Sequence, residues 1–250
     1  MPTGSLAPPR SSYLHVPFCA RRCGYCNFAV VADRLDLADD YLRAVALELE
    51  RTPGEHPVDT LYFGGGTPTE LPADKLATLC ETVLRHRTPT AGCEWTIEAN
   101  PLDVTDRDAA VWLAARGINR VSLGAQSLNP AKLKRLERDH SPRDVRRAVE
   151  HLRSAGLSVA IDLIFAAPDE SFDDWRRDLE AVVDLRPDHV STYGLTYEPG
   201  AEFWGRLKRG QLVERPEELQ RDMYAYAIDR LGEAGFEHYE ISNFARPGLR

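Results

Sequence analysis

Three cysteines near the start of the chain are its strongest chemical signal. Cys19, Cys23 and Cys26 lie within eight residues, whereas Cys80 and Cys93 lie far from this group. Three thiolates in a loop of this size can wrap a four-iron, four-sulfur cluster. Because no fourth cysteine is near, one iron would lack a protein ligand, and such an open position distinguishes a catalytic metal site from a closed structural one. We therefore expect Cys19, Cys23 and Cys26 to bind a [4Fe–4S] cluster.

The alternatives to a cluster are a zinc site and a chance grouping of cysteines. A zinc site needs a fourth ligand, for which His15 and His140 are the candidates, but structural zinc sites favour paired CxxC arms. His15 alternates with apolar neighbours, a pattern more typical of a hydrogen-bonded core histidine than of a ligand. For Cys80 and Cys93, we expect small buried apolar side chains.

Glycines and a carboxylate follow two later apolar runs. Residues 64–66 are all glycine, and glycine lets backbone amides approach a ligand without a Cβ in the way. A plain strand-to-helix turn explains a glycine run equally well. Glu98 ends an apolar run, where a buried carboxylate requires a cationic or hydrogen-bonding partner. A cofactor amine or ribose hydroxyl could be that partner.

Short apolar runs alternate with longer amphipathic ones, and this alternation decides how the candidate residues are positioned. It predicts strands joined by helices, several of which begin at Asp, Thr or Ser and end near Gly or Pro. Because parallel strands need a crossover that is usually a helix, we expect an α/β fold with a parallel sheet. Periodicity does not distinguish between a doubly wound sheet and a partial barrel. In both architectures the functional site lies at the carboxyl ends of the strands. The expected strands are residues 13–16, 60–63, 95–98, 121–123, 159–164 and 190–193, and the expected helices are 36–51, 73–86, 106–115, 143–155 and 171–184.

The two ends of the chain differ in composition from this central part. Residues 1–11 are rich in Pro and Gly and are expected to form a flexible leader, followed by a core at 12–198. Residues 199–250 begin with a Gly- and Pro-containing stretch, and a helix at 217–234 and a strand at 238–241 are expected after it. The sequence then stops in a loop-like composition, so we expect a truncated C-terminal region.

Charge and composition argue against several kinds of partner. The chain of 250 residues has a formal net charge of -8 and a sequence pI near 5.4, whereas binding to nucleic acid or an anionic membrane needs a clustered excess of Lys and Arg. The densest basic run, residues 132–138, predicts a helix with a solvated charged face. No run approaches the ~20 apolar residues that span a bilayer, and the first residues lack the apolar core of a signal peptide. We expect a cytoplasmic protein with reduced thiols and no nucleic-acid partner.

The cysteine loop and three later motifs together resemble one known family. Residues 13–28 resemble the cluster loop of radical S-adenosylmethionine (SAM) enzymes. Residues 63–69, 98–101 and 161–164 (FGGGTPT, EANP and IDLI) resemble motifs of the oxygen-independent coproporphyrinogen oxidase group and its HemW-like relatives. The resemblance implies a radical SAM partial (β/α)6 barrel and the start of a C-terminal α+β extension related to porphyrin or haem binding. It also implies that SAM chelates the open iron and that an electron from the cluster cleaves SAM to a 5′-deoxyadenosyl radical.

The resemblance also identifies residues that would contact SAM. Gln126 directly follows residues 121–125, the run that contains the expected strand 121–123, so it is expected at the carboxyl end of the sheet. Asp162 has the alternative of a core carboxylate capped by backbone amides, and Arg138 that of a surface helix arginine. The positions that the resemblance assigns to SAM are Tyr13, Tyr25, Gly65, Gly66, Thr67, Glu98, Gln126, Arg138 and Asp162.

Two functions share this barrel and cluster. One is a HemW-like haem chaperone that binds haem and transfers it to acceptor proteins, and the other is an oxygen-independent coproporphyrinogen III oxidase of haem biosynthesis. The oxidases typically have a longer segment before the first strand and an extra cysteine after the third ligand, whereas this chain has a short leader and Asn27. Both features favour the chaperone. Neither feature excludes a different radical reaction. A low-potential electron donor such as flavodoxin is a further implied partner.

The last motif gives little information by itself. Residues 239–244 match the run that precedes a haem-associated segment in HemW-like proteins, and the chain ends before that segment. Without the resemblance, the same residues predict an ordinary edge strand. We therefore expect them to contribute no ligand.

Overall fold

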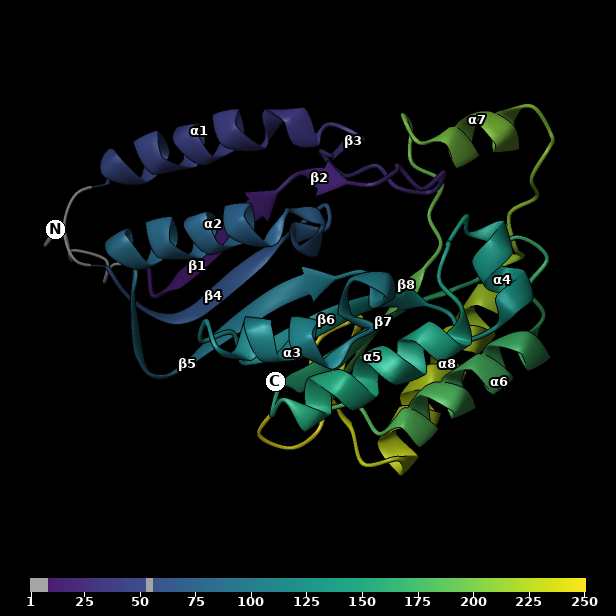
Figure 1. Cartoon of the computed structure of the whole chain (residues 1–250). Helices are drawn as coiled ribbons and strands as arrows, with labels where there is room; N and C mark the ends of the chain where they lie inside the picture. The colour runs from purple at the N-terminus through teal and green to yellow at the C-terminus, as the bar shows by residue number, and fades with distance from the viewer. Residues whose placement is uncertain (1–8, 53–55) are drawn as a thin grey trace, which may run out of the picture.

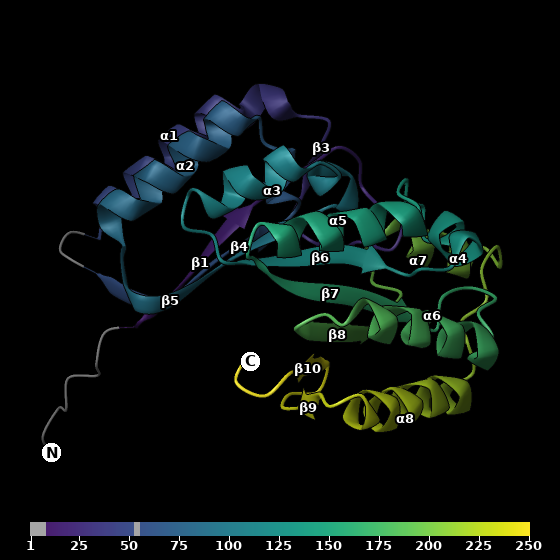
Figure 2. The same ribbon diagram turned by 60° about the horizontal axis from the view of Figure 1, so that its bottom comes forward.

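Six parallel strands form the centre of the molecule. The computed structural model describes residues 9–52 and 56–250, so residues 1–8 of the expected leader lie outside the described part. The parallel strands lie in the sheet in the order in which they occur in the chain, and Figure 2 shows them fanning out from β1 to β8. A doubly wound sheet would reverse this order at a switch point, so the α/β fold is confirmed and the partial barrel is the form it takes. The strands are β1 (Ser11–Val16), β4 (Pro57–Gly65), β5 (Thr88–Ala99), β6 (Arg120–Gln126), β7 (Ser158–Phe165) and β8 (His189–Gly194).

Helices cover the outer side of this sheet (Figure 1). Two of them begin with capping boxes, in which Ser141 and Ser171 each bond reciprocally with the Asp three residues later. All five predicted crossover helices and the helix predicted at 217–234 are confirmed, α4 is the helix of the basic run, and among the described helices only α7 was not predicted. No helix of the described residues combines the length and the apolar composition needed to cross a bilayer. The helices are α1 (Ala38–Glu50), α2 (Ala73–His86), α3 (Arg107–Ala114), α4 (Pro130–Arg135), α5 (Pro142–Ser154), α6 (Phe172–Leu185), α7 (Glu202–Lys208) and α8 (Glu217–Glu233), with short 3-10 turns at Leu35–Leu37, Pro68–Glu70 and Pro101–Val104.

The parallel strands have an apolar outer side and a polar inner side. Ile97 and Ile161 are fully buried in the hydrophobic core. The residues that follow them, Glu98 and Asp162, line the barrel interior, as does Ser122, which is paired in register with Glu98. Successive strand residues point to opposite faces, so each strand contributes apolar contacts to the helices and polar groups to the interior.

The end of the chain adds two antiparallel strands to the same sheet. β10 (Asn243–Ala245) pairs with β8, and β9 (Glu237–His238) pairs with β10. The strand predicted at 238–241 is therefore wrong in position. The reason is a turn in which the Glu240 carboxylate accepts hydrogen bonds from the amide of Ser242 (3.1 Å) and the side chain of Asn243 (2.7 Å). The predicted boundary between a core at residues 12–198 and a separate C-terminal region at residues 199–250 stays a prediction.

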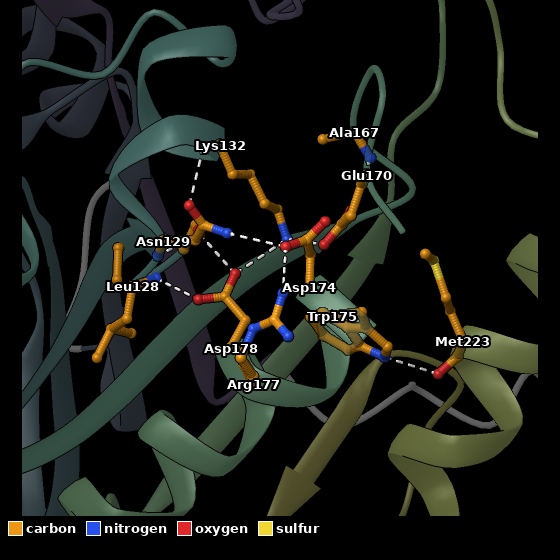
Figure 3. Close-up of polar contacts among 12 residues, drawn as sticks. Leu128, Asn129, Lys132, Ala167, Glu170, Asp174, Trp175, Arg177, Asp178 and Met223 are labelled. Carbon is orange, nitrogen blue, oxygen red and sulfur yellow. Dashed lines mark hydrogen bonds and ion pairs between the residues drawn. The ribbon is translucent and has the colours of Figure 1, made fainter. Parts of the chain in front are cut away.

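The basic run at 132–138 also differs from its prediction. Lys134 and Arg135 are exposed, but Lys132 is only 1% exposed. Its ammonium group binds the carboxylates of Glu170 (2.6 Å) and Asp178 (3.1 Å), as Figure 3 shows. The expected solvated face is wrong at Lys132 because both acidic partners lie about 40 residues or more away in sequence, on the segment after β7 and on α6. Lys132 therefore links α4 to α6 and to the segment after β7 through buried ion pairs.

Candidate functional site

The three cysteines of the cluster motif lie on one loop. This cluster loop, residues 19–30, connects β2 (Phe18–Cys19) to β3 (Val31–Ala32), and the two short strands pair with each other. The amide of Cys26 donates to the carbonyl of Cys23 (3.0 Å), so the backbone turns tightly between the last two cysteines. All three cysteines line one cavity of about 860 Å³, together with residues at the carboxyl ends of the parallel strands. The structure thus brings the expected cluster ligands to the expected edge of the sheet.

The electrostatics of these thiols fit a metal cluster. Burial raises the pKa of Cys19 to about 11, against the lowering effect of the Thr67 hydroxyl, and the neighbouring thiols of Cys26 and Cys23 add to the rise. Burial also raises the pKa of Cys26. Thiolates gathered in this way need positive charge, and bound iron supplies it. Three converging sulfur donors without a fourth are the ligand set of a cluster with one open iron.

The residues invoked for a zinc alternative make other contacts. His140 is 4% exposed, and its Nε2 bonds the carbonyl oxygen of Ala125 (2.9 Å). His15 is half-buried, with Nε2 bonded to the carbonyl of Ala29 (2.8 Å) and Nδ1 to the Tyr13 hydroxyl (3.2 Å). Among residues 9–52 and 56–250, no three His, Cys, Asp or Glu side chains converge tightly enough to bind a single metal ion. A four-iron cluster spreads its thiolates further apart than one ion does.

The glycines at the end of β4 contact Glu98. The amide of Gly65 donates to Glu98 Oε2 (2.8 Å), and the Tyr62 hydroxyl donates to Oε1 (2.9 Å). A Cβ on Gly64 would lie 2.7 Å from the Glu98 carboxyl carbon, and one on Gly65, whose φ is +114°, would lie 2.3 Å from the His15 ring. The glycines are therefore required by the protein's own close contacts, and Glu98 already has hydrogen-bonding partners in the chain. Burial raises the pKa of Glu98 despite them.

A second carboxylate, Asp162 on β7, lies in the barrel interior. Its Oδ2 accepts a hydrogen bond from the Ser122 hydroxyl (3.0 Å). The structure therefore shows a hydroxyl partner in place of the backbone amides of the alternative prediction. Burial raises the pKa of Asp162 to about 6, and the charge of Glu98 adds to the rise. Two carboxylates with raised pKa values in one cavity are the kind of perturbed pair that marks functional sites.

Arg138 connects the cluster loop to β6. Its Nη1 donates to the Cys23 sulfur (3.5 Å) and its Nη2 to the carbonyl of Gly124 (3.0 Å), whereas the buried Nε has no partner among the described residues. The alternative of a surface helix arginine is therefore wrong, because α4 ends at Arg135 and the chain then turns Arg138 inward. Gln126 ends β6 with a φ of +62°, an uncommon backbone conformation for a residue other than glycine, and lines the same cavity.

The residues expected to contact SAM lie together, with one exception. Tyr13 is 57% exposed, stacks on Tyr62 with 5.9 Å between ring centres, and does not line the cavity. The expected residues that do line it are Tyr25, Gly65, Gly66, Thr67, Glu98, Gln126, Arg138 and Asp162.

Several residues around the site were missed by the sequence reasoning. Glu137, next to Arg138, accepts a hydrogen bond from the amide of Gly24 in the cluster loop (2.9 Å). Tyr239 and Asn243, expected to contribute no ligand, line the cavity together with His189, whose Nε2 bonds the Tyr239 hydroxyl (2.9 Å). The alternation of polar and apolar residues along β5 to β8 is a signal that could have identified this polar interior.

Several known proteins are similar to this chain in sequence. The profile of the radical SAM superfamily matches residues 13–182. The haem chaperone HemW of Mycobacterium tuberculosis (strain H37Rv) is 41% identical over 251 residues, a region covering 96% of this chain and 63% of that protein. HemW of Lactococcus lactis is 38% identical, covering 98% and 64%, and HemW of Escherichia coli is 35% identical, covering 97% and 64%.

The solved structure of the coproporphyrinogen III oxidase HemN from Escherichia coli, a radical SAM enzyme, superposes with a TM-score of 0.85. It is 28% identical, and the match covers 96% of this chain and 56% of that chain. The present chain spans less than two thirds of the length of these relatives. On its cysteine loop, its barrel and these matches, the chain belongs to the radical SAM superfamily, in the group that contains HemN and HemW.

Proposed function

We propose that the chain is the radical SAM core of a HemW-like haem chaperone, which binds haem and transfers it to acceptor proteins in the cytoplasm. The observation that carries the radical SAM part is the convergence of three thiols, two carboxylates and a buried guanidinium on one cavity. The haem part is supported by the similarity to HemW proteins over nearly the whole chain.

In this proposal Cys19, Cys23 and Cys26 hold a [4Fe–4S] cluster. When bound, the cluster and SAM supply reductive radical chemistry. The free Nε of Arg138 suits a carboxylate, because a buried guanidinium donor without a partner is unfavourable until it is bonded. Glu98 and Asp162 suit an amine and ribose hydroxyl groups, because each presents acceptor oxygens in the cavity.

The second candidate function is oxygen-independent coproporphyrinogen III oxidase. The structural match to HemN favours it, and the cavity continues past the residues assigned to SAM toward Arg120 and His189, where a further ligand has room. Asn27 argues against it, because the cavity carries an amide at the position where the oxidases have a cysteine.

Turnover assays on the full-length protein separate these functions. The protein is reconstituted anaerobically and reduced, SAM is added, and 5′-deoxyadenosine and porphyrin products are measured with and without coproporphyrinogen III. We expect a cluster that binds SAM, no conversion of coproporphyrinogen, and saturable binding of haem in a separate titration. Conversion to protoporphyrinogen would establish the oxidase, and a protein without a cluster would refute both functions.

A further inference from the structure

A second cleft, of about 410 Å³, lies between the cluster loop and α7, which are neighbours in Figure 1. It is lined by Arg22 and Cys23 from the loop and by Glu202 and Trp204 from α7. Cys23 thus lines both this outer cleft and the inner cavity. A cluster held by Cys23 would therefore lie beside this surface cleft as well as beside the inner cavity.

The two sides of the cleft are held firmly together. The amide of Phe203 donates to the carbonyl of Gly24 (2.7 Å), and a Cβ on Gly24 would lie 2.5 Å from the Phe203 ring. The Glu137 carboxylate accepts from the amide of Gly24 (2.9 Å) and pairs with Arg206 on α7 (2.8 Å). The surface is therefore formed before any partner binds, which reduces the entropy that binding would lose.

The charge of this surface is opposite to that of the whole chain. Arg22, Lys208 and Arg209, here called the basic patch, are exposed, and in the described part of the chain none has a carboxylate within 4.0 Å. The acidic residue of the cleft, Glu202, shares Arg206 (2.6 Å) with Glu137, so these three side chains together carry one net negative charge against the three cations of the basic patch. Arg22 lines the cleft, Lys208 lies over the ring of Trp204, and Arg209 lies beside Gly205, so three cations without a carboxylate partner among the described residues border the cleft. The protein as a whole has a formal net charge of -8.

We propose that the basic patch and the cleft dock an acidic protein that carries a low-potential, one-electron redox group. This inference rests on the proposed function, because it requires a cluster on Cys23. One electron leaves the reduced group of the partner and reduces the cluster by one electron, and no bond or proton is transferred. Charge complementarity favours an acidic partner, and electron-transfer encounters need only a small interface, below about 1,200 Å². Trp204, with the Lys208 ammonium 4.4 Å from its ring centre, supplies apolar contact area at the same place.

The test uses the reconstituted full-length protein and reduced flavodoxin as the probe. The variant K208E/R209E reverses two charges of the basic patch without altering the cluster loop. The variant R146E/R147E changes the net charge equally but on exposed positions of α5. Stopped-flow absorbance measures the second-order rate of cluster reduction by flavodoxin at low ionic strength, and dithionite provides a reductant that needs no docking.

We expect K208E/R209E to slow reduction by flavodoxin about tenfold or more, because steering of an acidic partner is lost, and R146E/R147E to change it less than about twofold. Reduction by dithionite should be the same in all three proteins, and added salt should slow only those with an intact patch. Equal losses in the two variants, or no loss in K208E/R209E, would overturn the docking site. A cluster that dithionite cannot reduce would instead refute the proposed function.

Discussion

Replacement of Lys132 by Met tests how much the buried ion pairs of Lys132 with Glu170 and Asp178 stabilise the folded protein. Lys132 neutralises Glu170 and Asp178, and all three side chains are at most 1% exposed. Met fills a similar volume but leaves two buried carboxylates without a cation, and breaking a buried ion pair in this way costs about 3–5 kcal/mol. In the variant, Asp178 keeps a hydrogen bond from the amide of Leu128, and Glu170 keeps one from the amide of Ala167. We therefore expect the free energy of unfolding to fall by about 3 kcal/mol, the lower end of this range.

Urea denaturation of both proteins at pH 7 measures this loss. Burial already raises the pKa of Glu170, and without Lys132 it should rise further. A carboxyl group whose pKa is raised in the folded state stabilises that state at low pH and loses this effect as the pH rises through the folded pKa. The deficit of Lys132→Met should therefore shrink from pH 7 to pH 5.5. Lys134→Met, on the exposed side of the same helix, is the matched control and should change stability by less than about 0.5 kcal/mol. A Lys132 variant as stable as this control would refute the reasoning.

Three further predictions concern the cavity. Glu98→Gln should leave the iron content unchanged but weaken SAM binding about tenfold by calorimetry, because a charged acceptor is lost; unchanged affinity would contradict its role. Because the pKa of Asp162 is raised to about 6, SAM affinity should increase from pH 5 to pH 7 as the carboxylate becomes charged, and Asp162→Asn should remove this increase. Gly65→Ala should destabilise the fold by more than about 2 kcal/mol in urea, because it adds a clash with His15 to an unfavourable φ. Gly92→Ala has a similar φ of +82° but open space around it, and an equal loss there would show that the clash is unimportant.

Much of the fold and the cluster ligands could be predicted because their signals are local. The spacing of Cys19, Cys23 and Cys26 is contained in one loop, and the alternation of strands and helices is a property of short windows. The environment of Lys132 could not be predicted, because the exposure of a basic side chain depends on acidic partners that only the folded chain brings near. The same holds for Arg138, which follows a short helix and turns inward to Cys23.

The last strands show a second kind of limit. Residues 238–241 have the composition of a strand, but the Glu240 carboxylate forms a turn with Ser242 and Asn243 and divides the run in two. Competition between a side chain and the strand ladder for the same backbone groups is not visible in a pattern of apolar residues.

The central claim is that Cys19, Cys23 and Cys26 together hold one [4Fe–4S] cluster. Its most direct test is the iron and sulfide content of the anaerobically reconstituted protein and of the three single Cys→Ala variants, with Cys80→Ala as the matched control. The unaltered protein and the control should each carry about four irons and four sulfides per chain, and each of the three variants should lose the cluster. A variant of Cys19, Cys23 or Cys26 that still carries about four irons would contradict the account.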